Sequence, residues 1–159
     1  MLQLIPRPLH RLLLYFAHAV RVVWWRVAKP RLVDCRVVAL DEAGRVLLVR
    51  HSYGSGVWML PGGGPRRGEG AVEAAMRELR EEVGCVLTEA REVAKPDPHA
   101  ARCMYVVVGR ASGNPAVDGR EVVEGRFFPL GELPKPVSPQ LGGRLTHWIR
   151  RYRESAPTS

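Results

Sequence analysis

Three glutamates in the middle of the chain, Glu78, Glu81 and Glu82, are spaced three and four residues apart. In a helix this spacing places their carboxylates on one face. The like charges repel, and their crowding should raise the pKa of at least one carboxyl group. A hard divalent cation such as Mg²⁺, or Mn²⁺ as a substitute, neutralises such a cluster and prefers oxygen ligands. The pattern therefore predicts a metal site.

A run of three glycines, 62–64, precedes this segment. Glycine lets the backbone approach a ligand closely, so the turn can direct the carbonyl oxygens of Gly62 and Gly63 toward a metal. Its amides, with the start of the helix, could receive phosphate oxygens. This set supports attack of water on phosphorus, in which the metal acidifies the water and a glutamate takes its proton. For a glutamate pair taken alone, a solvated helix face is the competing interpretation.

A longer pattern surrounds these glutamates: Gly63, then Glu69, then Arg-Glu-Leu-Arg-Glu-Glu-Val-Gly-Cys at 77–85. This pattern resembles the Nudix box, and every fixed charged and glycine position of the box is present at its spacing. So many fixed positions make a chance match very improbable, unlike a short motif. The segments 44–50, 58–63 and 127–134 also resemble the family. The resemblance covers roughly 32–153 and leaves residues 1–30 outside it.

The resemblance implies an α/β fold, a Nudix-type α/β/α sandwich with a mixed sheet. It implies metal-dependent hydrolysis of a phosphoanhydride bond in a nucleoside diphosphate linked to another moiety, of the nucleoside triphosphate, nucleotide sugar or ADP-ribose type. The three clustered glutamates would bind Mg²⁺ or serve as the base, with a carbonyl of Gly62 or Gly63 as a further ligand. Arg77 would orient the glutamates, and Glu69 would brace the loop or support the metal shell.

The chain departs from the family pattern at two positions. Cys85 replaces an aliphatic residue, which is a mild change. Arg66 stands where many members have a glutamate, which places a cation near the phosphates in place of an outer metal ligand. Many members also use a downstream acidic residue, for which Glu121 is the first candidate and Glu124 the second. An exposed carboxylate at a strand edge is an equally good interpretation of Glu121.

Candidates for substrate binding lie before and within the box. They are Arg50, Tyr53, Arg66 and Glu69. His51 could also bind phosphate or stack on a base, and His99 lies in a loop that could border the site. Trp58 is more often a packing residue than a platform for a base. Each of these residues has a surface or core interpretation beside the functional one.

A helix over 70–83 must position the glutamates, with Gly84 as its stop signal. At 100° per residue Val72, Met76, Leu79 and Val83 form its core face, and the glutamates lie opposite. Strands are expected at 32–40, 46–49, 58–60, 104–108 and 126–130, with a final amphipathic helix after 141. Interleaved strands and helices indicate α/β or α+β layering.

Bulk properties limit the function classes. The chain has 159 residues, which fits one domain, and 46% hydrophobic and 25% charged residues are typical of a globular protein. The net charge of +8 favours anionic partners without choosing among them. Three widely spaced cysteines in apolar runs suggest buried thiols in a reducing cytoplasm.

Residues 1–30 contain no acidic residue and carry leucines, valines and a tryptophan pair at helical spacing, with arginines largely off that stripe. They are predicted to form a basic amphipathic helix outside a Nudix domain at 31–155. The stretch free of Arg and Lys is too short for a membrane span. Two interpretations stay open: the helix packs on the domain or in a homodimer, or it lies on an anionic membrane surface, which would make the protein membrane-peripheral.

Three functions from different classes remain for the chain. The leading one is a hydrolase of a small nucleotide substrate. The second is a non-catalytic nucleotide-binding or regulatory module, against which the crowded like charges argue. The third is an RNA-end pyrophosphohydrolase, favoured by the charge of +8 but weakened by the lack of a clear aromatic and basic strand face. No specific nucleic-acid partner is predicted.

Overall fold

A computed structural model describes residues 32–95, 102–141 and 143–155. Its elements are β1 (Leu32–Leu40), β2 (Val46–His51), α2 (Ala71–Val83), β3 (Val86–Ala94), β4 (Arg102–Ser112), β5 (Val122–Phe128), the 3₁₀ turn η2 (Pro139–Leu141) and α3 (Leu145–Glu154). The predicted helix at 1–30 and the loop candidate His99 lie outside the described residues.

The five strands form one mixed sheet in the order β3-β4-β1-β2-β5. The central pair β1 and β4 is parallel, with register from Leu32↔Arg102 to Leu40↔Arg110, and the other pairs are antiparallel. Successive side chains of a strand point to opposite faces, so the apolar run of β1 supplies both sides of the sheet. The expectation of an α/β fold with a mixed sheet is confirmed.

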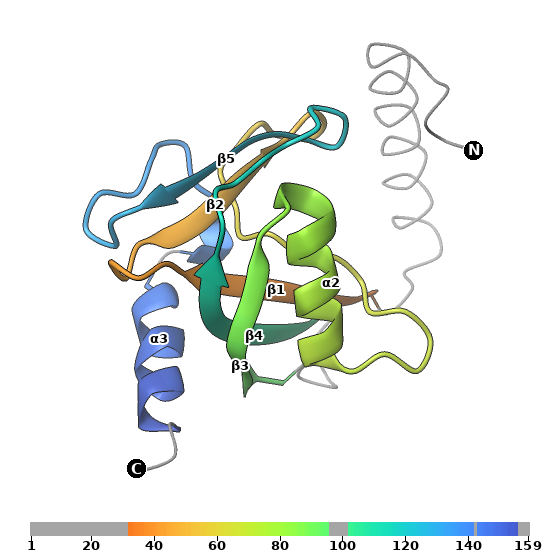
Figure 1. The fold of residues 1–159 in the computed structure, drawn as a ribbon, viewed down its shortest axis with the longest axis vertical. Helices are drawn as coiled ribbons and strands as arrows, with labels where there is room; N and C mark the ends of the chain where they lie inside the picture. The colour runs from red at the N-terminus through yellow and green to blue at the C-terminus, as the bar shows by residue number, and fades with distance from the viewer. Residues whose placement is uncertain (1–31, 96–101, 142, 156–159) are drawn as a thin grey trace.

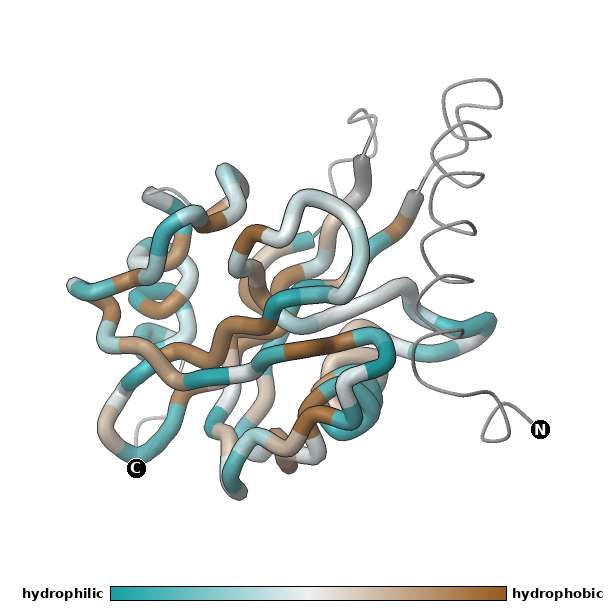
Figure 2. Tube along the Cα trace, turned by 90° about the horizontal axis from the view of Figure 1, so that it is seen from above, coloured by the Kyte–Doolittle hydropathy of each residue, from teal (hydrophilic) through white to brown (hydrophobic). Residues whose placement is uncertain are grey.

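Helices α2 and α3 cover opposite faces of this sheet (Figure 1). On one face Cys35 and Val37 of β1 pack in a buried cluster with Leu79 of α2. On the other face Val38 packs in a second cluster with Trp148 of α3. Figure 2 shows hydrophobic residues along the interior strands and hydrophilic ones in the turns. Because both faces of the sheet carry apolar side chains, one helix packs on each face and the fold has three layers.

The core face of α2 differs from the predicted one. Leu79 and Val83 are fully buried as expected, and Val72 is half-buried. Met76, in contrast, is 37% exposed, so its place in the core face is wrong. The alanines at 71, 74 and 75 are buried instead. Because small side chains let a helix lie close to a sheet, the contact face is rotated away from Met76.

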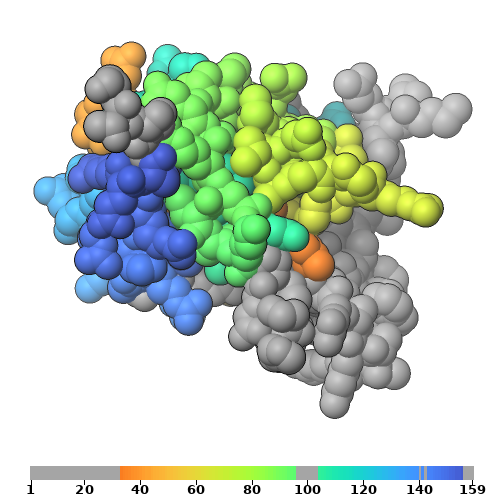
Figure 3. Space-filling model, turned by 90° about the horizontal axis from the view of Figure 1, so that it is seen from below, coloured from red at the N-terminus to blue at the C-terminus, as the bar shows by residue number. Residues whose placement is uncertain are grey.

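Strand β3 was not expected, and the strand expected at 58–60 is not regular. Strand β3 carries few apolar residues in strict alternation, and its pairing with β4 shifts register twice. Residues Trp58 and Met59 form only isolated bridges, to Val137 and Val49. Figure 3 shows the α3 helix in dark blue beside the green surface formed by α2 and β3. No helix in the described part of the chain is long and apolar enough to cross a membrane.

Candidate active site

The glycine turn at 62–64 is fastened to strand β1. The amide of Cys35 donates to the carbonyl oxygen of Gly63 at 2.9 Å, and the amide of Val37 donates to that of Pro61 at 2.9 Å. A Cβ on Gly62, where φ is 141°, would lie 2.0 Å from the Cys35 carbonyl oxygen. No side chain fits there, so the close approach of turn and strand requires glycine.

The same turn touches the glutamates of α2. A Cβ on Gly63 would lie 2.5 Å from Oε1 of Glu78. The amide of Gly62 donates to Oε2 of Glu82 at 3.1 Å. Two carboxylates of the helix therefore lie between α2 and the turn, whereas sequence reasoning placed all three opposite the core. Side-chain exposure is 15% for Glu78, 7% for Glu82 and 49% for Glu81.

Burial makes the two inner carboxylates hard to ionise. Burial raises the pKa of Glu82 to about 8 and outweighs the hydrogen bond from the Gly62 amide, which lowers it. Repulsion from Glu78 and Glu121 raises this pKa further, and the charge of Arg36 lowers it. The pKa of Glu78 is also raised, again mainly by burial and despite its bond to Arg77. The expected rise of a carboxyl pKa is confirmed, but loss of solvent contributes more to it than crowding does.

Arg77 joins three carboxylates and the loop. Its guanidinium binds Glu69 in a two-pronged pair, Nε to Oε1 and Nη2 to Oε2, both at 2.8 Å. It also donates to Oε1 of Glu78 at 2.7 Å, to Oε2 of Glu81 at 3.2 Å and to the Gly64 carbonyl at 3.2 Å. Its hydrogen bond lowers the pKa of Glu69 to about 2, helped by the backbone amide of Arg66. This network fixes the loop and one of the two inner carboxylates, Glu78.

Glu81 lies at the rim of the site. Its Oε1 accepts from Nη2 of Arg66 at 3.0 Å, and its other oxygen faces Arg77. Arg66 thus lies beside Glu81, and its expected place near the phosphates stays a prediction. It pairs with a carboxylate in this arrangement, so a metal would have to compete with two arginines for Glu81.

The downstream candidate Glu121 lies near the buried pair, and Glu124 does not share its surroundings. The charge of Glu121 raises the pKa of both Glu78 and Glu82, which places it within electrostatic range. The hydroxyl of Tyr53 donates to its Oε1 at 2.8 Å. Glu124 is paired at 2.6 Å with Arg50 and with Arg126.

Arg50 is not brought to the glutamates. Its guanidinium pairs with Glu124 and lies 5.7 Å from the ring centre of Trp58, which belongs to the cluster on the α3 face. Trp58 is 8% exposed and packs edge-on against Phe128, as its packing interpretation predicted. The next residue, His51, points the other way, with Nε2 3.9 Å from Oε1 of Glu82.

Sequence reasoning missed Arg36 and Asp34. The Arg36 guanidinium donates to the carbonyl oxygens of Leu60 at 3.2 Å and Gly62 at 3.5 Å, and it pairs with Asp34 at 2.6 Å. It therefore supports the glycine turn from the strand side. The sequence did contain a sign of this pair: two opposite charges lie two residues apart in an otherwise apolar strand. That spacing places both side chains on one face of the strand.

The donor set suits a hard divalent cation. Two nearly buried carboxylates, a third at the rim and two loop carbonyls are oxygen ligands of the kind that Mg²⁺ and Mn²⁺ prefer. Across residues 32–95, 102–141 and 143–155, no three His, Cys, Asp or Glu side chains already surround one point. Glu81 turns outward to its arginines, so a complete shell requires it to turn inward. A cation beside these two largely buried acids would stabilise their ionised forms.

Comparison with known proteins identifies the family to which this geometry corresponds. Residues 30–149 match the family described as NUDIX domain. A segment of 48 residues is 44% identical to an RNA pyrophosphohydrolase of Teredinibacter turnerae and covers 30% of this chain and 28% of that protein. Over 127 residues the chain is 29% identical to the human (Homo sapiens) 8-oxo-dGDP phosphatase NUDT18, covering 75% of this chain and 39% of that protein. The chain thus spans well under half the length of either relative.

The fold also matches solved structures. The MutT NUDIX hydrolase from Burkholderia pseudomallei superposes with a TM-score of 0.58 at 24% identity, over 80% of this chain and 99% of that one. At this identity the likeness concerns the arrangement of the sheet and its two covering helices.

Proposed function

This chain belongs to the NUDIX domain family, and from that membership we propose that it is a metal-dependent pyrophosphohydrolase. Its substrate is a nucleoside diphosphate linked to another moiety, of the nucleoside triphosphate, nucleotide sugar or ADP-ribose type. The observation that carries the proposal is the pair of largely buried carboxylates, Glu78 and Glu82, held against the glycine turn. Two adjacent buried acids are costly to ionise, and a dication beside them offsets that cost.

We assign the metal ligands to the inner surface of α2 and to the turn. Glu78 and Glu82 supply carboxylate oxygens, and Gly62 or Gly63 supplies a carbonyl oxygen. Glu81 and Glu121 would add further carboxylate oxygens. A bound Mg²⁺ or Mn²⁺ supplies acidification of a water molecule and neutralisation of the diphosphate charge.

The chain's own side chains orient and receive the reacting groups. Arg77, fixed by Glu69, holds Glu78 in place and keeps the loop closed on the helix. Arg66 at the rim can exchange its bond to Glu81 for a phosphate oxygen, because guanidinium binds both groups in the same geometry. Tyr53 positions Glu121, and one carboxylate of the glutamate cluster accepts the proton of the attacking water.

The comparisons support the class of substrate and not one compound. One relative is named for RNA and the other for 8-oxo-dGDP, so the named molecules differ in the group that they carry. Both names describe hydrolysis at the phosphates of a nucleotide or a nucleic acid. We therefore propose the reaction at the level of the diphosphate and test the attached group directly.

A substrate panel tests the proposed hydrolysis. The full chain is assayed with nucleoside triphosphates, nucleotide sugars, ADP-ribose and 5′-triphosphorylated RNA, with Mg²⁺ or Mn²⁺, and release of phosphate and nucleoside monophosphate is measured. Glu82→Gln removes one charged ligand, so turnover should fall roughly 100-fold or more. The matched control is Glu73→Gln, on the exposed first turn of the same helix, where glutamine can still accept the Gly70 amide. This control should keep its activity.

Two results would contradict the proposal. Retained turnover in Glu82→Gln with an intact fold would remove the glutamate from the reaction. Lack of turnover of every substrate with either metal would favour a nucleotide-binding module, which equilibrium binding of the same nucleotides would then reveal.

A further inference from the structure

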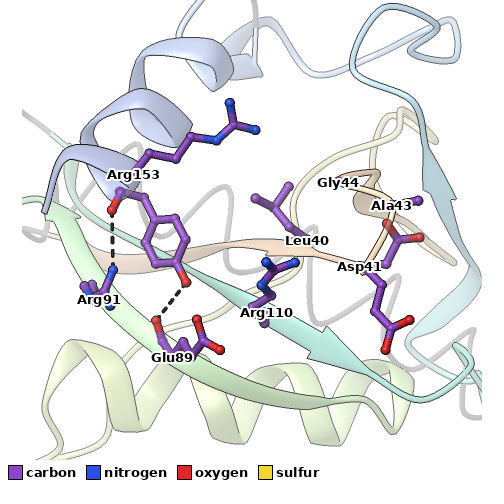
Figure 4. A pocket seen from close by; sticks show the side chains of 10 residues that line it. Leu40, Asp41, Ala43, Gly44, Glu89, Arg91, Arg110 and Arg153 are labelled. Carbon is purple, nitrogen blue, oxygen red and sulfur yellow. Dashed lines mark hydrogen bonds between the residues drawn. The ribbon is translucent and has the colours of Figure 1, made fainter. Parts of the chain in front are cut away.

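A cavity lies on the face of the sheet that α3 covers. It measures about 490 Å³ and is bounded by Leu40 at the end of β1, by the 41–44 turn and by Tyr152 of α3 (Figure 4). This volume is within the range of sites for small organic ligands. Leu40 and Val108 belong to the cluster under α3, and their partners in the neighbouring strands are Arg110 and Arg91. Residues paired across two strands face the same side of a sheet. The cavity therefore lies on the α3 side, and the sheet separates it from the glutamates.

Three arginines from three elements line this cavity: Arg91 of β3, Arg110 of β4 and Arg153 of α3. Within the part of the chain that the structure describes, none of the three has a carboxylate within ion-pair distance. By contrast, Arg45, beside the same turn, is paired with Asp41 at 2.6 Å. The charges of Arg110 and Arg153 are therefore available to an anion.

The cavity is partly preorganised. Arg91 donates from Nη1 to the Tyr152 carbonyl at 3.4 Å and lies 5.0 Å from the centre of its ring. The Tyr152 hydroxyl donates to the Glu89 carbonyl oxygen at 3.1 Å, which fixes the wall between β3 and α3. Figure 4 shows Arg110 in the middle of the floor, between Leu40 and Glu89. A ligand would meet a fixed guanidinium and a rigid aromatic wall.

The acidic lining limits which anion fits. Asp41 is held by Arg45 through its side chain and also accepts the Arg45 amide at 2.8 Å, so its charge is largely offset. The carboxylates of Glu42 and Glu89 remain and can accept hydroxyl or amino hydrogens. A bare polyanion would be repelled by these two carboxylates. A phosphate monoester with hydroxyl groups satisfies both the arginines and the acids.

We propose that this cavity is a second ligand site, distinct from the glutamate site, which binds a small phosphate monoester of nucleoside-monophosphate size. Arg110 and Arg153 contact the phosphate, and Glu42 and Glu89 accept hydrogens from the sugar. The proposal does not depend on hydrolytic activity, because no residue of the glutamate site takes part in it.

The test is a binding titration of the full chain with adenosine 5′-monophosphate, in EDTA so that no divalent metal holds the ligand at the glutamates. Amide shifts in a ¹⁵N-labelled sample locate the site, and adenosine is the matched ligand without phosphate. We expect shifts at 40–44, 89–91, 110 and 152–153, with affinity in the roughly millimolar range or tighter. Adenosine should bind about tenfold more weakly or worse, because it lacks the charge-assisted hydrogen bonds.

Substitutions of exposed arginines test which side chains bind the phosphate. Arg110→Gln and Arg153→Gln should each weaken binding about tenfold without altering the thermal midpoint or hydrolysis. Arg151→Gln, an exposed arginine on the same helix that does not line the cavity, should bind as the unchanged protein does. Equal binding by Arg110→Gln and the unchanged protein would overturn the proposal. Shifts confined to 62–64, or equal affinity for adenosine, would overturn it as well.

Discussion

At the scale of single residues, the site depends on an arginine that touches no reacting group. Arg77 is 15% exposed and contacts Glu69, Glu78, Glu81 and the carbonyl of Gly64. A planar guanidinium can bind these partners at once because its donors lie in a fixed fork. An ammonium group carries the same charge but cannot reproduce that geometry. Shape, and not only charge, therefore positions the carboxylates.

Arg77→Lys tests this distinction. The change keeps the charge and loses the two-pronged pair with Glu69, so kcat/KM should fall about tenfold or more while the fold persists. The Mg²⁺ concentration needed for half-maximal activity should rise as well, because Glu78 loses its orientation. Arg80→Lys, at an exposed position of the same helix, is the matched control and should leave both quantities unchanged. Unchanged kinetics in Arg77→Lys would show that the fork has no positioning role.

At the scale of elements, the sequence predicted the parts with strong periodicity. The spacing of glutamates and glycines located α2 and its turn, and the apolar runs located β1 and β2. The position of Met76 could not be predicted, because apolar periodicity does not reveal that buried alanines bring the helix close to the sheet. Strand β3 was missed because an edge strand with exposed polar residues and shifted register lacks regular alternation. The partners of Arg50 and Arg36 depend on distant segments, which local spacing does not define.

The glycine turn is an element whose function rests on missing side chains. Gly63→Ala would place a Cβ 2.5 Å from Oε1 of Glu78, so the carboxylate must move. We expect about 100-fold loss of metal-dependent turnover, because displacement of a ligand by about an ångström is enough for that effect. The measurement is kcat/KM alongside the thermal midpoint.

Gly131→Ala is the control for that change. A Cβ at Gly131 meets nothing within 4 Å, so its activity and stability should match those of the unchanged protein. Full activity in Gly63→Ala would mean that Glu78 is free to shift without consequence, which contradicts its assignment as a metal ligand.

At the scale of the whole molecule, the two faces of the sheet carry different candidate sites. The α2 face holds the carboxylates, and the α3 face holds the arginine-lined cavity. The net charge of +8 across the chain favours phosphate-bearing ligands at both. Residues 1–30 carry part of this charge without any acid.

Removal of residues 1–28 tests whether they serve only for attachment. If residues 1–28 serve only for attachment, the shortened chain should keep its thermal midpoint and its kcat, since the described core clusters already fill both faces of the sheet from residue 35 onward. The full chain should sediment with vesicles that contain phosphatidylserine and the shortened chain should not, because a basic amphipathic segment is attracted to anionic lipid. Aggregation of the shortened chain, or a change of its oligomeric mass, would instead assign the segment to packing.

The parallel pairing of β1 with β4 bears on how the protein is made. Strand β1 is synthesised early, but its partner follows β2, α2 and β3 in the chain. A growing polypeptide on the ribosome can form the glutamate helix long before the centre of the sheet is closed. Until β4 is synthesised, one edge of β1 has no partner strand. We expect chaperones to bind the chain mainly during this stage of translation.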